Sequence, residues 1–112
     1  MVALSSITTL GLYATAQIRT IAGTTHTLVD DDHGYILNCT SASAVTITVP
    51  TGLRTGFLVG ISQGGAGKVT LAVSGTTITE RDGKLATAAQ YVLLSLVQFS
   101  ANTYRLFGPT AA

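Results

Sequence analysis

Hydrophobic and polar residues alternate through the middle of the chain. In the segments 45–49, 57–61 and 69–73, large apolar residues occupy every second position. A period of two places alternate side chains on opposite faces of a β-strand, so each segment is typical of a strand with one buried face. Turn-forming residues separate the segments, notably at 50–56 and in the glycine-rich stretch 64–67. The pattern predicts three strands joined by two turns.

Similar segments recur along the rest of the chain, with turn signals at a spacing of roughly 8–12 residues. No segment holds a helical period, and the abundant threonine suits strands better than helices. Asn102 suits the left-handed position of a short turn, which predicts a hairpin between the last two strands. The strands are expected near 19–21, 25–29, 35–39, 44–49, 57–62, 68–73, 76–80, 90–99 and 104–107.

These features predict an all-β fold, a small antiparallel β-sandwich, jelly-roll-like or barrel domain with an extended N-terminal arm. The spacing of strands does not give their order, so these architectures stay open as alternatives. At 112 residues the chain has the length of one domain. We expect the arm at residues 1–17 and the β-domain at residues 18–112.

The arm is predicted from residues 1–17, which carry no charge and no clean period. One interpretation is a first strand with a frayed end. The other is a segment that lies on a neighbouring subunit or on another protein, and it is the one we favour. Its apolar side chains would then supply the contact: Val2, Leu4, Ile7, Leu10, Leu12 and Tyr13.

The predicted strand at 90–99 differs from the others because both of its faces are apolar. Val92, Leu94 and Leu96 would point to one side. A strand of this kind must be covered on both sides, either by the N-terminal segment or by a symmetry-related subunit. We expect the second face to lie at the interface of a homotrimer; its residues are Tyr91, Leu93, Val97 and Phe99.

Composition supports association and excludes two classes of partner. Charged residues make up 10% of the chain, well below the roughly 25% of typical soluble proteins, which leaves little charge to keep molecules apart. The six Lys and Arg residues are scattered singly and the net charge is +1, so no basic stripe favours nucleic acid. The longest apolar run, 91–99, is too short to span a membrane as a helix, which needs about 20 residues.

Candidate chemistry is sparse. The segment from Asp30 to His33, with His26 nearby, offers metal-ligating groups, but its spacing does not match an EF-hand. We interpret it as a turn in which Asp side chains accept backbone N–H groups and Gly34 supplies an unusual dihedral angle. The stretch 62–68 lacks the residue pattern of a phosphate-binding loop and is predicted to be a hairpin turn.

The remaining candidate groups point away from catalysis. Cys39 is the one cysteine, and its neighbours in the pattern suggest an inert core thiol. The tyrosines could form a sugar-stacking platform, but the absence of tryptophan and their spacing favour strand packing; they are Tyr13, Tyr35, Tyr91 and Tyr104. We therefore expect no enzyme activity, no metal and no cofactor.

About three quarters of the chain resembles a small β-domain that recurs in tailed-bacteriophage virion proteins, both in tail fibres and in head-decoration chains. The matching elements are Asp32-His33-Gly34, the segment 43–50, Gly52-Leu53, Gly56-Phe57, the segments 61–63 and 65–67, Val69-Thr70-Leu71, Gln90-Tyr91 and the segment 102–108.

The resemblance implies a structural virion protein and carries no catalytic residues to transfer. Because the chain has no long shaft, the expectation is a capsid decoration (cement) protein that binds and stabilises the phage head as a trimer. Its partner would be the major capsid protein, and its location the capsid surface of the virion. The alternative is a tail-fibre or head-fibre adhesin domain that binds host-surface glycans.

Overall fold

The computed structural model describes residues 17–112 of the chain. The predicted arm therefore lies outside the described residues, apart from Gln17, which begins the first strand. The same holds for the six apolar residues assigned to its contact: Val2, Leu4, Ile7, Leu10, Leu12 and Tyr13.

The regular secondary structure of residues 17–112 is β-strand apart from one 3₁₀ turn, so the predicted all-β class is confirmed. All nine expected strands are present within a few residues of their predicted bounds, and one 3₁₀ turn, η1 (Asp30–Asp32), precedes the third. The strands are β1 (Gln17–Ile21), β2 (Thr25–Thr27), β3 (Tyr35–Cys39), β4 (Val45–Pro50), β5 (Leu58–Gln63), β6 (Val69–Ser74), β7 (Thr77–Thr79), β8 (Ala86–Thr87), β9 (Leu93–Ser100), β10 (Thr103–Phe107) and β11 (Thr110–Ala111).

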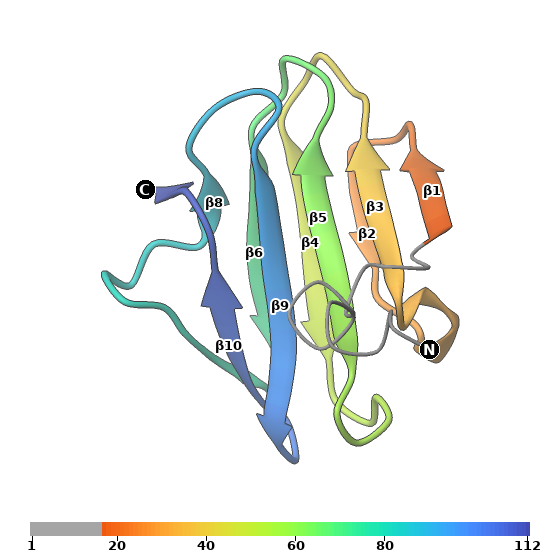
Figure 1. Cartoon of the computed structure of the whole chain (residues 1–112), viewed down its shortest axis with the longest axis vertical. Coiled ribbons are helices and arrows are strands. Elements are labelled where there is room, and N and C mark those ends of the chain that lie inside the picture. Colours follow the sequence, from red (N-terminus) through yellow and green to blue (C-terminus); the bar gives the residue numbers. More distant parts are fainter. Residues whose placement is uncertain (1–16) are drawn as a thin grey trace, which may run out of the picture.

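The first six strands alternate between two facing sheets. Strands β1, β3 and β5 are parallel neighbours in a six-stranded sheet, whereas β2, β4 and β6 are parallel neighbours in a five-stranded sheet. Each odd-numbered strand and the strand that follows it make one coil, and successive coils stack side by side (Figure 1). This part of the chain is a short solenoid.

The C-terminal strands close one end of this stack. Strand β9 pairs antiparallel with β5, and β8 pairs antiparallel with β6. Strand β10 adds to β9, β7 adds parallel to β10, and β11 adds to β8. The final orders are β1-β3-β5-β9-β10-β7 in the six-stranded sheet and β11-β8-β6-β4-β2 in the five-stranded sheet.

The prediction of an antiparallel fold is wrong, because both sheets are mixed. A period of two identifies the buried face of a strand, but it does not give the direction of the neighbouring strand. The predicted hairpin turn at 62–68 is also wrong, because this stretch carries the chain from β5 in one sheet to β6 in the other. The hairpin between β9 and β10 is confirmed, and Asn102 has the expected positive φ of 56°.

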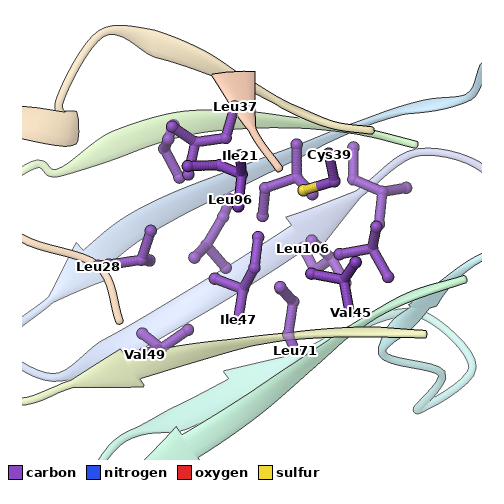
Figure 2. Close-up of a cluster of buried hydrophobic side chains, with 14 of the residues drawn as sticks. Ile21, Leu28, Leu37, Cys39, Val45, Ile47, Val49, Leu71, Leu96 and Leu106 are labelled. Carbon is purple, nitrogen blue, oxygen red and sulfur yellow. The ribbon is translucent and has the colours of Figure 1, made fainter. Parts of the chain in front are cut away.

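One hydrophobic core lies between the two sheets. Figure 2 shows side chains from both sheets converging in this space, including Leu37 and Cys39 from β3 and Val45 and Ile47 from β4. The inward faces predicted for the segments 45–49 and 57–61 are confirmed. In the third segment only the first two apolar positions are buried, and Val73 is half exposed.

The segments that carry the chain from one sheet to the other form the corners of the coils. Successive corners stack on one another through backbone hydrogen bonds. The N–H groups of Gly64 and Gly65 donate to the carbonyl of Cys39 at 2.8 and 2.9 Å, and the N–H of Gly67 donates to Ser41 at 3.0 Å. A Cβ atom on Gly67 would overlap the carbonyl of Ser43, and one on Gly65 would overlap backbone carbonyls of the same corner. Glycine is required here because the two backbones leave no room for a side chain.

Buried glutamines fasten the closing strands to the stack. Gln98 of β9 accepts the N–H of Gly56 at 3.0 Å and donates to the hydroxyl of Tyr104 at 3.2 Å. Gln63 of β5 accepts the hydroxyl of Thr87 in β8. In the described part of the chain, no buried side-chain nitrogen or oxygen lacks a hydrogen-bond partner. The polar groups of the core therefore hold particular strands together and do not form a binding site.

Replacement of Gly67 by alanine is expected to lower the free energy of unfolding by at least about 2 kcal/mol, because the new methyl group overpacks a backbone contact. The matched control is Gly23→Ala, since a Cβ atom on Gly23 meets nothing within 4 Å and its φ is not positive. We expect that control to stay within about 1 kcal/mol of the parent. Urea unfolding followed by far-UV circular dichroism measures both, and equal effects would contradict the stacked corner.

Candidate functional site

Two features of the described structure are candidates for function: a charged cluster around Asp32, and the outer face of the six-stranded sheet. The cluster joins β1, β2 and η1. The carboxylate of Asp32 is fully buried and accepts a hydrogen bond from the guanidinium of Arg19. Its second oxygen lies 2.9 Å from Nε2 of His26 and 3.0 Å from the backbone nitrogen of Val29, which donates to it.

This cluster stabilises the fold rather than forming a catalytic or metal-binding site. All three donors point at one buried carboxylate, and the Arg19 guanidinium also lies 4.1 Å from the ring centroid of Tyr35. The predicted turn is confirmed: Gly34 has a φ of 81°, and Asp30 accepts the N–H of Arg54 at 2.7 Å. Sequence reasoning found the turn but missed the ion pair, which joins residues on separate elements.

The other candidate groups for metal or nucleophilic chemistry have structural partners. Nδ1 of His33 accepts the N–H of Leu58 at 3.1 Å, which fixes the ring against Phe57. Cys39 is buried, and burial raises the pKa of its thiol to about 11. At neutral pH the group is therefore a thiol and not the reactive thiolate. Residues 17–112 contain no group of three or more His, Cys, Asp or Glu side chains that could hold a metal ion.

The outer face of the six-stranded sheet carries exposed apolar side chains. Inward-facing Leu94 and Leu96 are fully buried, so the alternate positions of β9 point outward. Three residues predicted at a subunit interface are exposed: Tyr91 by 79%, Leu93 by 39% and Phe99 by 54%. The fourth, Val97, is half-buried on the same face.

Two further apolar residues extend this face beyond the predicted set. Phe107 of β10 is 48% exposed and its ring centroid lies 6.3 Å from that of Phe99. Ile18 of β1 is 60% exposed at the other edge of the same sheet. The alternation of 104–107, with Tyr104 and Leu106 buried, is the signal that identifies Phe107 as outward-facing.

Tyr91 has an unusual backbone conformation for an aromatic residue. It lies in the turn before β9 with a φ of 71°, in the left-handed region that bulky residues rarely adopt. Its N–H donates to the carbonyl of Gln63 at 2.7 Å, which holds the turn in place. A large apolar side chain is thus held almost fully exposed on a strained turn, and such strain is concentrated at functional positions.

Comparison with known proteins adds no assignment: no protein-family model and no curated protein sequence matches the chain. Within residues 17–112 there is also no helix with the length and hydrophobicity needed to cross a bilayer. The candidate site therefore stands on the geometry of the outer face alone.

Replacement of Asp32 by alanine is expected to lower the free energy of unfolding by at least about 2 kcal/mol, because it leaves Arg19 and His26 without their buried partner. The matched control is Asp31→Ala, whose side chain is exposed and whose loss is expected to cost less than about 0.5 kcal/mol. Chemical unfolding of the two variants at neutral pH gives the comparison. A stable Asp32→Ala variant would show that the cluster is dispensable.

Proposed function

We propose that this chain is a structural virion protein that decorates a bacteriophage head as a homotrimer. The observation that carries the proposal is the exposed apolar outer face of the six-stranded sheet. Large apolar side chains gathered on one face are typical of interaction sites, since isolated soluble domains seldom leave such patches open. The resemblance to small virion β-domains supplies the biological setting.

A second copy of the chain is the proposed occupant of the half of this face around Tyr91 and Leu93. Only 10% of residues are charged, so like molecules repel one another weakly when these faces approach. Permanent interfaces resemble a domain core cut in half and often bury more than about 2,000 Å². The face offers the apolar side chains that such an interface needs, on a rigid central strand of the sheet.

The two facing sheets suit a structural role, and we class them as a β-sandwich assembled from solenoid coils. The ionisable groups best placed for chemistry, Asp32 and Cys39, are both buried and serve the fold. This supports the proposal that the protein is not an enzyme and needs no cofactor.

Residues 1–17 are proposed to hold the major capsid protein. They are uncharged, and they precede β1, which begins at Gln17 and forms one edge of the six-stranded sheet. Burial of one large apolar side chain is worth roughly 1.5–3 kcal/mol before the cost of ordering the chain is subtracted. Three such segments on a trimer would act together through their effective concentration.

The alternative proposal is a fibre adhesin that binds host-surface glycans. The observation that favours it is the exposed ring of Tyr91, since saccharides stack on aromatic side chains. Both proposals make the chain a virion component. They differ in its position, which imaging separates directly.

The trimer predicts a particle of three times the 11.5 kDa chain mass at micromolar concentration, measured by light scattering coupled to size exclusion. Leu93→Glu places a charge in the proposed contact and is expected to release monomers. The matched control, Thr46→Glu, adds the same charge to an exposed position on the five-stranded sheet and should stay trimeric. A parent protein that is monomeric under these conditions would contradict the proposal.

Decoration of the head predicts where an antibody raised against this chain binds purified virions. Gold label is expected on the shell, at many sites per particle, because a cement protein occupies repeated positions on the capsid lattice. Label restricted to the tail or its fibres would support the adhesin instead. Virions free of label, from a stock shown by mass spectrometry to lack the chain, would contradict both.

A further inference from the structure

A groove of about 570 Å³ lies on the outer face of the six-stranded sheet, where β7 and β9 end on either side of β10. One wall is formed by residues 79–81, and the other by Phe99 and Ser100. Arg105 and Phe107 of β10 also line it. Its volume is within the range of sites that bind small ligands or single side chains of a partner, roughly 300–1,000 Å³.

The apolar part of the groove is a pair of tilted rings. Phe99 and Phe107 lie with their ring centroids 6.3 Å apart and their planes at 49°. The guanidinium of Arg105 lies 4.2 Å from the Phe99 centroid, so one face of that ring is already covered. Tilted rings with one covered face make a poor flat platform for a sugar. They do fit one aromatic or large aliphatic side chain, packed edge to face.

The carboxylate that lines the groove belongs to Glu80, and it already accepts hydrogen bonds from other residues of the chain. Oε1 of Glu80 accepts the N–H groups of Asp82 and Lys84, both at 2.8 Å, and Oε2 accepts the hydroxyl of Thr110 at 2.7 Å. These hydrogen bonds, that from Lys84 first, lower the pKa of Glu80 and keep it ionised. Glu80 therefore serves the loop that follows β7 and is not free to receive a ligand.

Arg105 is the cation left available in the groove. Among the described residues it has no carboxylate partner, whereas Arg81 lies 3.3 Å from the carboxylate of Asp82. A guanidinium stacked on an aromatic ring keeps its N–H groups free, and these can bind a carboxylate that lies in the plane of the guanidinium. The complementary ligand must carry an acidic group next to an apolar one.

We propose that this groove binds an acidic peptide segment of a partner protein. An apolar side chain of the segment packs against the exposed surface of the Phe99–Phe107 pair, and a neighbouring carboxylate pairs with Arg105. Of the four residues predicted at the trimer interface, Phe99 lines this groove, whereas Tyr91 and Leu93 do not, so the trimer contact proposed around Tyr91 and Leu93 uses other residues. The inference does not require the head location, and its failure would leave the trimer proposal intact.

The test is an NMR titration of the ¹⁵N-labelled full chain with the acetylated peptide Ser-Glu-Glu-Phe-Glu-Glu-Ser at millimolar concentration. Amide signals of 79–81 and 103–108 are expected to shift and to saturate. Phe107→Ala is expected to weaken binding about 10-fold and Arg105→Ala about 3- to 5-fold. Both variants should keep the mass of the parent in light scattering, which separates the groove from the trimer contact.

Two controls define the chemistry. The peptide Ser-Lys-Lys-Phe-Lys-Lys-Ser is expected to leave the groove amides unshifted. Lys68→Ala removes one positive charge from the corner before β6, in the other sheet, and should bind the acidic peptide as the parent does. Equal weakening by Lys68→Ala and Arg105→Ala would overturn the proposal in favour of unspecific attraction. Groove amides that respond to galacturonic acid oligomers but not to the peptide would also overturn it, and so would no response to either.

Discussion

The contact between successive corners of the chain is the constraint on which the rest of the structure depends. Glycine N–H groups at one corner donate to carbonyls of the corner before it, with no side chain between the two backbones. This fixes the distance between coils at the hydrogen-bonding spacing of neighbouring strands. Both sheets then continue in register, and the inward positions of each coil meet in one shared core.

The same stacking explains why the fold needs its C-terminal strands. A solenoid coil presents two open strand edges, and unpaired edges are templates for uncontrolled pairing with other chains. Strands β8 and β9 cover the edges of β6 and β5 with antiparallel partners, held by Gln63 and Gln98. The sheet widened in this way exposes the apolar face of β9, so the closing of the stack and the candidate interaction surface share one element.

Sequence reasoning located the strands and their buried faces, because a period of two is a local signal. Inward positions such as Ile47 and Leu96 followed from it directly, and so did the outward positions Leu93, Val97 and Phe99, whereas Tyr91 lies in the turn before β9 and outside the period. Strand direction did not follow, since the corner at 64–67 has the composition of a hairpin turn. Strands β8 and β11 were missed because two residues carry no period. The pairing of Arg19 with Asp32 was missed because it depends on how coils stack.

The order of the strands has a consequence for how the chain is made. During synthesis the coils emerge first, and β9 follows only after the whole of β6, β7 and β8. Until then the edge of β5 that β9 later covers is unpaired, and such edges are templates for pairing with other chains. In the cotranslational interval before β9 docks, this edge is therefore open to mispairing between chains. A ribosome that pauses between β6 and β9 would prolong it.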